Sequence, residues 1–272
     1  MFKWLFLFVG IYLLYVWVKK KNAPPSAVKN PANPISDMAQ KDIEPEVMVP
    51  CHYCQVHLPK SDAIFFDGRS YCSESHLNAL DEYGWVGSAR WRPSPNHETR
   101  SENISPDLVV IHHISLPPGE FKNKDSSQYI IDFFQNRLDV SAHPYFLEIA
   151  HQKVSSHFLI TRHGELIQFV STKNKAWHAG VSSFQGREKC NDFSIGIELE
   201  GDGASAFTEE QYQALTALVK KLEAIYFNLQ FAGHSDIAPE RKTDPGIFFD
   251  WQKFQKETKI SDKNLPFGLS SR

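Results

Sequence analysis

The sequence predicts an α/β domain in which helices pack on a mixed β-sheet. Three observations support this fold class. Residues 108–111 form a short uninterrupted apolar run, which is typical of a buried strand. Residues 194–199 alternate between aliphatic and other side chains with the period of a strand. Residues 208–211 form a capping box at the start of an amphipathic pattern, which predicts a helix.

The composition is that of an ordinary globular protein, with 42% hydrophobic and 22% charged residues in a chain of 272. It excludes a wholly disordered chain and a polytopic membrane protein. The net charge of −3 gives no support for a general nucleic-acid binder, so we expect no nucleic-acid partner. Four cysteines are too few for a disulfide scaffold, whereas twelve histidines supply many potential metal ligands.

The chain begins with an apolar segment, residues 4–18, that contains no charged side chain. As a helix it would span about 22 Å, which is less than the ~30 Å of a hydrocarbon core. The flanking Lys3 and Lys19–Lys21 can snorkel, and Trp4 and Trp17 are suited to the two interfaces. A cleaved signal peptide is the alternative, but no Ala-x-Ala site follows and the lysines adjoin the apolar run. We therefore expect a transmembrane anchor.

The anchor covers residues 1–21 and is followed by a linker over 22–49. More lysines follow the apolar run than precede it, and the positive-inside rule then keeps the rest of the chain in the cytoplasm. The linker is rich in proline and has no aromatic residue, so it cannot bury enough apolar surface to offset its ordering entropy. A semi-extended tether is expected there.

Residues 50–80 have the cysteine and histidine spacing of a small zinc-ribbon-like module. The pattern C-x2-C followed by C-x3-H supplies four tetrahedral ligands: Cys51, Cys54, Cys72 and His76. His52 and His57 are alternative ligands, and the cysteines could instead be ordinary buried thiols. Asp67-Gly68 predicts a hairpin turn between the two ligand pairs. So short a segment has too little core to fold unaided, and a structural zinc ion would supply the missing stability.

The first half of the large domain contains a predicted helix and a predicted hairpin. Residues 157–160 and 166–170 are strand-like and flank a turn at 162–165. Residues 126–138 have apolar side chains on one helical face, namely Tyr129, Ile130, Phe133, Phe134 and Leu138.

The second half of the large domain contains the alternating strand and the capped helix. Alternation places Glu198 on the opposite strand face from Ile195, Ile197 and Leu199. The helix that starts at Thr208 has apolar residues at helical spacing, namely Tyr212, Leu215, Leu218, Val219, Leu222, Ile225 and Tyr226.

Several polar residues are not explained by this apolar pattern. His112 and His113 end the strand that begins at Leu108, and strand ends are common places for functional sites. A loop over 233–246 contains three more candidates: His234, Lys242 and Asp244. Two histidines and a carboxylate, with a fourth position left for water, make a catalytic zinc site. From spacing alone, each of these residues could equally be a satisfied turn or core polar group.

Four long stretches resemble the AmpD family of N-acetylmuramoyl-L-alanine amidases, a zinc amidase family within the Amidase_2 or peptidoglycan-recognition superfamily. The stretches are Ile111–Phe121, Lys175–Val181, Cys190–Gly201 and Gly233–Gly246. Gly84–Arg90 with Pro93–Pro95 is similar to the N-terminus of that family. The resemblance covers residues 84–258, leaves 259–272 as a tail, and does not extend to residues 1–80.

The resemblance implies a fold, a reaction and a set of site residues. The family hydrolyses the amide between N-acetylmuramic acid and L-alanine, with 1,6-anhydro-muropeptides of cell-wall recycling as the favoured substrates. It implies a catalytic zinc held by His112, His234 and Asp244. It implies Glu198 as catalytic acid–base and Lys242 as catalytic cation. It places Trp177, His178 and Arg241 near the substrate. Together with the anchor, it implies a single-pass protein of a bacterial inner membrane.

One position departs from the family pattern, because His113 replaces the usual Asn after the first ligand. Adjacent strand residues face opposite ways, so only one of His112 and His113 can reach the metal, and we expect His112. Two alternative functions stay open from the sequence. They are a non-catalytic peptidoglycan-binding receptor and a periplasm-facing amidase that acts on intact peptidoglycan.

Overall fold

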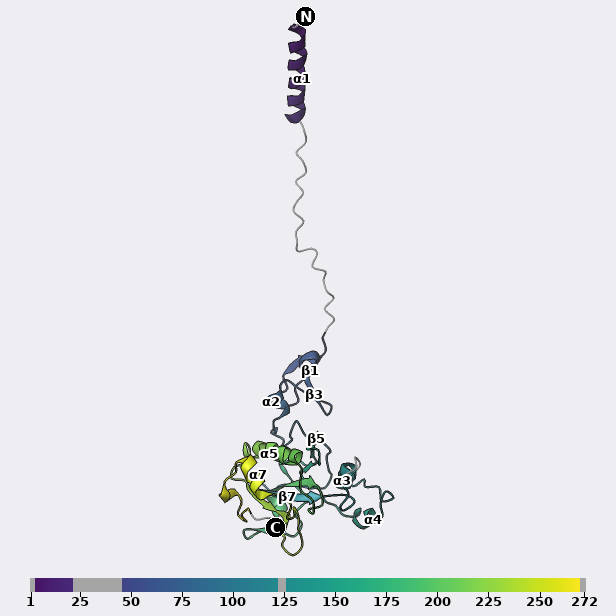
Figure 1. The fold of residues 1–272 in the computed structure, drawn as a ribbon, viewed down its shortest axis with the longest axis vertical. Helices are drawn as coiled ribbons and strands as arrows, with labels where there is room; N and C mark the ends of the chain where they lie inside the picture. Colours follow the sequence, from purple (N-terminus) through teal and green to yellow (C-terminus); the bar gives the residue numbers. More distant parts are fainter. Residues whose placement is uncertain (1–2, 22–45, 122–125, 270–272) are drawn as a thin grey trace. The chain divides into compact units, whose positions relative to one another are not determined.

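The computed structural model describes residues 3–21, 46–121 and 126–269, and it divides the chain into two compact units, Met1–Glu46 and Val47–Arg272 (Figure 1). The first unit contains helix α1 (Lys3–Lys21), which ends on three lysines. Across the described ranges, no helix combines the length and apolarity needed to cross a membrane. Most of the predicted linker, residues 22–45, lies outside the described residues.

The second unit begins with two small antiparallel pairs. β1 (Met48–Pro50) pairs with β2 (His57–Pro59), and β3 (Ile64–Phe66) pairs with β4 (Arg69–Tyr71). Short helices η1 (Lys60–Asp62) and α2 (Glu74–Leu77) complete this small module. The predicted hairpin turn is confirmed, since Asp67 and Gly68 both have positive φ, at 46° and 78°, as a type I′ turn requires.

The β3–β4 hairpin of this module packs on the edge of the large sheet. The Asp67 carboxylate accepts hydrogen bonds from the backbone N–H of Trp91, at 3.0 Å, and from the Arg92 guanidinium, at 3.3 Å. Arg69 donates to the Ala89 carbonyl at 2.7 Å and stacks on Trp91, 3.7 Å from the ring centroid. These contacts cover a strand edge that would otherwise expose unpaired backbone groups.

A six-stranded mixed sheet forms the centre of the large domain, in the order β14-β7-β13-β8-β9-β5. Its strands are β5 (Arg90–Trp91), β7 (Leu108–Ile114), β8 (Phe158–Ile160), β9 (Leu166–Gln168), β13 (Ser194–Glu200) and β14 (Gln230–Gly233). β14, β7, β13 and β8 run parallel, whereas β9 is antiparallel to β8. All seven residues of β13 are buried, as in a parallel strand covered on both faces.

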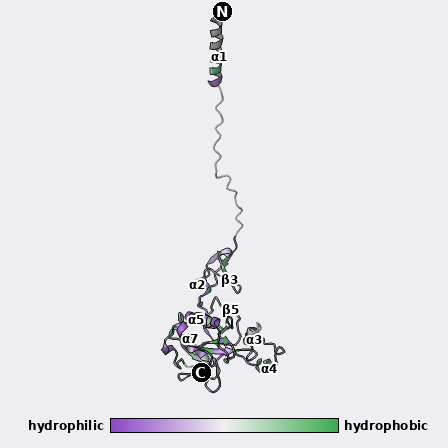
Figure 2. Ribbon diagram, viewed as in Figure 1, coloured by the Kyte–Doolittle hydropathy of each residue, from purple (hydrophilic) through white to green (hydrophobic). Residues whose placement is uncertain are grey.

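Helices cover the two faces of the sheet (Figure 1). On one face, α5 (Glu209–Glu223) and α7 (Trp251–Thr258) pack on odd-numbered strand residues such as Ile111 and Ile197. On the other, α3 (Ser126–Phe134) and α4 (Phe146–Ile149) pack on Leu159 and Ile167. Hydrophilic residues are conspicuous on α5 and α7 in Figure 2, as expected of helices with one face in solvent.

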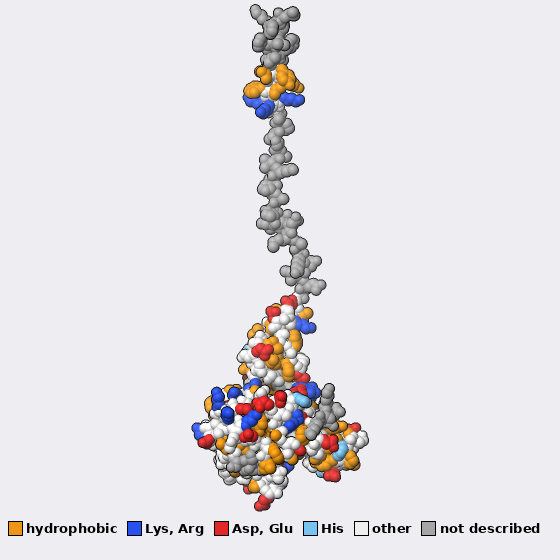
Figure 3. Space-filling model, viewed as in Figure 1, with side chains coloured by type: hydrophobic (Ala, Val, Ile, Leu, Met, Phe, Trp, Pro, Cys, Tyr) orange, Lys and Arg blue, Asp and Glu red, His pale blue; other side chains and the backbone are white. Residues whose placement is uncertain are grey.

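The remaining elements are short and surround the sheet. They are β6 (His97–Thr99) paired with β10 (Asn174–Ala176), β11 (Ser183–Phe184) paired with β12 (Arg187–Glu188), η2 (Cys190–Asp192), α6 (His234–Ile237) and η3 (Asp262–Asn264). On the face of this unit drawn in Figure 3, acidic and basic side chains are interspersed, in keeping with the small net charge.

Most predicted elements are confirmed, with two errors at helix ends. The capping box at Thr208 and the 157–170 hairpin are present. The helix predicted to reach residue 138 ends at Phe134, because Asn136 adopts a left-handed conformation with φ 58° that breaks the helix. Ile225 was predicted on the buried face of α5, but it follows the end of the helix and is 43% exposed.

Candidate active site

Three parallel strands bring candidate residues to one edge of the sheet. β13 pairs with β7 so that Glu198 lies directly opposite His112. β14 pairs with β7 so that Gly233 lies opposite Ile111, and His234 follows as the first residue of α6. The carboxyl ends of parallel strands meet at one edge, which is where open α/β sheets place their binding sites.

Asp244 joins the two histidines from the loop after α6. Its backbone carbonyl accepts a hydrogen bond from the Ser235 N–H at 2.8 Å, which folds the loop back over the sheet edge. Its Oδ2 lies 2.9 Å from His112 Nδ1 and 3.0 Å from His234 Nδ1. One ligand atom from each of these three side chains lies within 4.8 Å of the other two. Sequence positions far apart therefore converge as the resemblance implies.

The second histidine presents a lone pair to this cluster. His234 Nε2 lies 3.1 Å from the Ala179 carbonyl oxygen, which can only accept a hydrogen bond. The tautomer that is protonated at Nε2 donates to this carbonyl and leaves the Nδ1 lone pair facing Asp244. Arg241 donates to the same Ala179 carbonyl and to the Val181 carbonyl, each at 2.7 Å, and so holds the loop that fixes His234.

The electrostatics of the cluster fit a bound cation. Burial and the neighbouring His234 lower the pKa of His112 to about 4, so its ring is neutral at neutral pH. Two imidazoles and one carboxylate, all almost completely buried, form the donor set of a three-ligand zinc site.

Glu198 is the other buried acid at this edge. It is 8% exposed, and its Oε2 has no hydrogen-bond partner within the part of the chain that the structure describes. Burial raises the pKa of Glu198 well above its usual value, and the charge of Asp244 adds to this effect, whereas Lys242 opposes it. A raised pKa makes the ionised carboxylate a stronger proton acceptor, as a general base requires.

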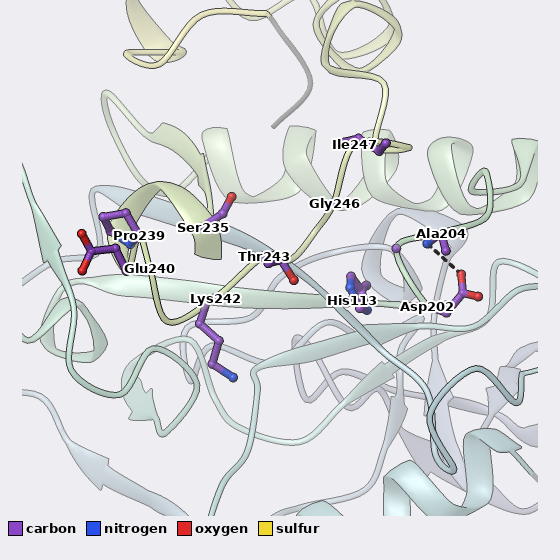
Figure 4. Close-up of a pocket in the computed structure, with 11 residues that line it drawn as sticks. His113, Asp202, Ala204, Ser235, Pro239, Glu240, Lys242, Thr243, Gly246 and Ile247 are labelled. Carbon is purple, nitrogen blue, oxygen red and sulfur yellow. Dashed lines mark hydrogen bonds between the residues drawn. The ribbon is translucent and has the colours of Figure 1, made fainter.

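Glu198 and the three candidate ligands line a cavity of about 210 Å³. Trp177 forms part of its wall, and exposed Lys242 lies at its rim. Two larger hollows, of about 430 and 500 Å³, adjoin it and share both His113 and Lys242 with it. Figure 4 shows the larger hollow, with Glu240 on one side, Asp202 on the other and His113 between them.

His113 faces away from the metal ligands. A Cβ atom added to Gly203 would lie 2.5 Å from His113 Nε2, so the ring packs directly against this glycine. Gly203 has a φ of +67°, which glycine adopts most readily. The cluster of potential ligand atoms includes His112 and not His113.

The predicted substrate residues take different positions. Trp177 is half-buried in the cavity wall. Arg241 borders a separate hollow of about 580 Å³ next to Val181. His178 lines the cavity, but both of its ring nitrogens contact other side chains of the protein, those of His112 and Ser194. Sequence reasoning did not find Ser194, although a glycine two residues later in a buried strand signals a close approach.

The small module also brings its predicted ligands together. One ligand atom from each of four residues lies within 4.8 Å of the others: Cys51, Cys54, Cys72 and His76. His76 Nδ1 lies 3.1 Å from Cys72 Sγ, whereas His52 packs its ring against Trp91, outside the cluster. Burial raises the pKa of Cys51, but backbone N–H groups of Cys54 and Cys72 more than offset it and lower the pKa to about 6.

Comparison with known proteins agrees with this geometry. Residues 102–247, more than half of the chain, match the Amidase_2 family, described as N-acetylmuramoyl-L-alanine amidase. This chain belongs to that family. The amidase is 51% identical over 178 residues to the 1,6-anhydro-N-acetylmuramyl-L-alanine amidase AmpD of Escherichia coli K12, covering 65% of this chain and 95% of the relative. It is 53% identical over 180 residues to AmpD of Citrobacter freundii, covering 65% and 92%.

The fold of the amidase is also similar to that of a solved AmpD structure. The crystal structure of a selenomethionine AmpD derivative matches with a TM-score of 0.62 at 50% identity, covering 65% of this chain and 97% of that one. The chain is therefore an enzyme of the N-acetylmuramoyl-L-alanine amidase type, which favours catalysis over the receptor alternative. The family match does not include the small Cys/His module.

Proposed function

We propose that this amidase uses zinc to hydrolyse the amide bond between 1,6-anhydro-N-acetylmuramic acid and L-alanine in soluble muropeptides of cell-wall recycling. One observation carries the proposal: two histidine Nδ1 atoms and the Asp244 carboxylate converge beside buried Glu198. The names of relatives that are 51% and 53% identical support the anhydro-muramyl substrate.

The residues of the chain divide the chemistry among them. Zinc held by His112, His234 and Asp244 would supply polarisation of the scissile carbonyl and acidification of water. Glu198 accepts a proton from the attacking water and delivers it to the leaving alanine nitrogen. Lys242, at the rim of the same cavity, stabilises the negative charge that develops on the carbonyl oxygen.

The adjoining hollows provide room for both sides of the scissile bond. Trp177 offers an apolar surface in the cavity wall, against which a sugar ring can pack. His113 and Lys242 line the two neighbouring hollows as well as the cavity, so one ligand can extend across all three. Arg241 borders the separate hollow next to Val181, and we propose that the peptide extends to it.

Mass spectrometry of the products tests this proposal. Zinc-loaded enzyme is incubated with anhydro-muropeptides and, separately, with intact sacculi, and a chelator-treated sample is the control. We expect free peptide that begins with L-alanine from the soluble substrate, much less product from sacculi, and none after chelation. Comparable turnover of sacculi would instead support an enzyme that acts on the intact wall.

We also propose that Cys51, Cys54, Cys72 and His76 bind a second, structural zinc ion. The clustering of their ligand atoms and the lowered pKa of Cys51 support this assignment, since zinc binds the thiolate. The module has few buried side chains of its own, so the metal would supply stability that its small core lacks.

We further propose that α1 attaches the enzyme to a bacterial inner membrane as a single-pass anchor, with the catalytic domain in the cytoplasm. The uncharged segment 4–18, flanked by lysines that can snorkel, supports the attachment. The excess of lysines after the segment supports the orientation. A cytoplasmic site is where soluble turnover products of the wall would meet a recycling enzyme.

A further inference from the structure

A chain of hydrogen bonds runs from the first metal ligand into the core. His112 Nε2 lies 2.9 Å from His178 Nδ1. His178 Nε2 lies 3.2 Å from Ser194 Oγ, and Ser194 Oγ donates to the Cys190 carbonyl at 2.6 Å. Ser194 is completely buried and His112 is 2% exposed, so water has little access to either end of the chain.

The hydrogen bond at the buried end of this chain favours one order of protons along it. A carbonyl oxygen only accepts, so the single hydroxyl proton of Ser194 points to Cys190. Ser194 Oγ can then only accept from His178 Nε2, which must carry a proton. His178 Nδ1 of the neutral ring is therefore an acceptor, and His112 Nε2 must donate to it. His112 Nδ1 is then left with a lone pair that faces the Asp244 carboxylate, which also only accepts, so this arrangement suits a cation bound by both atoms.

The position of His178 is itself tightly fixed. Asn191 Oδ1 accepts hydrogen bonds from the backbone N–H groups of His178, at 3.1 Å, and Ala179, at 2.8 Å. The ring lies against Gly196 in the middle of β13, where an added Cβ would be 2.6 Å from His178 Cγ. Only glycine at this strand position leaves space for the imidazole.

We propose that His178 is a positioning residue which, through Ser194, fixes His112 in the tautomer that binds the metal. The Ala179 carbonyl performs the same task directly for His234. Consecutive residues of one loop thus set the tautomers of both histidine ligands. The inference rests on the proposed zinc site, and it adds to it the means by which the site is prepared before metal binds.

The test combines zinc affinity with a direct measurement of the tautomer. Zinc binding to the full chain is measured by competition with a chromophoric chelator. The protonated nitrogen of His112 in the metal-free protein is identified from ¹⁵N chemical shifts of its ring. Three variants are compared. His178→Phe removes the acceptor, and His178→Asn supplies an Oδ1 atom that can replace Nδ1. Ser194→Ala removes the hydroxyl that His178 contacts. Ser94→Ala is the matched control, since buried Ser94 also donates to a carbonyl, that of Phe134, at 2.5 Å.

We expect His178→Phe to weaken zinc binding about 10–100-fold, the usual effect of losing a partner of a metal-bound histidine. His112 should then show both tautomers in place of the Nε2-protonated form alone. Ser194→Ala should shift the same tautomer with a smaller loss of affinity, His178→Asn should restore much of the affinity, and Ser94→Ala should match wild type.

Several results would overturn the inference. Wild-type zinc affinity and an unchanged His112 tautomer in both His178→Phe and Ser194→Ala would refute it. Equal losses in His178→Asn and His178→Phe would show that the ring acts through packing alone. If His178→Phe does not fold, the tautomer in Ser194→Ala decides the matter. Failure of the wild-type protein to bind zinc at this site would instead refute the proposed function.

Discussion

Glu198 and His112 occupy opposite positions on neighbouring parallel strands, so the proposed acid–base and the proposed first ligand share one rigid support. Rigid strands hold catalytic groups more accurately than loops do. Asp244 and Lys242 come from a loop, which is tied to α6 by the hydrogen bond from Ser235. Substitutions at these residues should therefore separate the chemical step from metal binding.

Glu198→Gln should retain zinc and the fold but lose most activity. Glutamine preserves the volume of the side chain but cannot accept a proton from water. Since general acid–base catalysis contributes about 10²–10⁴-fold, kcat should fall within that range. Steady-state kinetics with metal analysis on the same sample checks this. Turnover at the wild-type rate would show that another group moves the proton.

Asp244→Ala should act first on the metal, because it removes a ligand and lowers zinc affinity.

His113→Asn should change zinc affinity and activity little, since His113 faces Gly203 rather than the ligand cluster. Competition with a chelator measures zinc affinity in Asp244→Ala, His113→Asn and His112→Asn. If His113→Asn loses zinc while His112→Asn retains it, the ligand assignment is wrong.

The raised pKa of Glu198 predicts a pH-dependent stability in the metal-free protein. A raised pKa means that the folded state holds the proton more tightly than the unfolded state, whose pKa is ~4.3. The stabilisation is complete below that value and is lost as pH rises through the folded pKa. Glutamine does not titrate, so the Tm of Glu198→Gln minus the Tm of wild type should increase as pH rises above ~4.3. Thermal unfolding with chelator at a series of pH values measures the difference, and a constant difference would contradict it.

At the scale of elements, the small module and the large sheet are joined by the β3–β4 hairpin and edge strand β5. These contacts involve Asp67 and Arg69, which lie between the two ligand pairs of the module. The proposed catalytic and ligand residues lie on β7, β13, α6 and the loop after α6, and not on β5. Loss of the zinc ion proposed for the module should therefore disturb the fold of the module more than the catalytic step.

Cys51→Ser should reduce the zinc content from two ions per chain to one, disorder residues 51–76 and leave amidase activity largely intact. Metal analysis, proteolysis of the module and product formation measure the three effects. Cys190→Ala is the matched control, because Cys190 is a buried free cysteine outside the cluster. One zinc per chain in wild type, unchanged by Cys51→Ser, would exclude a metal in the module.

At the scale of the whole molecule, the proposed function joins a membrane anchor, a metal module and an amidase domain in one chain. The lysines after residues 4–18 predict that the amidase domain stays in the cytoplasm. A C-terminal reporter that is active only in the periplasm should give no signal, and its cytoplasmic counterpart should be active. A strong periplasmic signal would favour an enzyme that acts on the intact wall.

The sequence by itself determined the local elements and the candidate chemistry. The 157–170 hairpin, the capped helix α5 and the Asp67-Gly68 turn were all predictable, because side-chain period, capping and turn geometry depend on residues close in the chain. The candidate ligands were predictable as residue types, but spacing alone left open whether His112, His234 and Asp244 meet.

Only the tertiary structure decided how these residues are combined. The register of β13 on β7 places Glu198 beside His112, and the fold places His178 between His112 and Ser194. Strand register and loop position depend on the packing of the whole domain, whose free energy is spread over contacts distant in sequence. The helix predicted to reach residue 138 ended at Phe134 for a related reason, since the conformation of Asn136 interrupts a pattern that is helical in sequence alone.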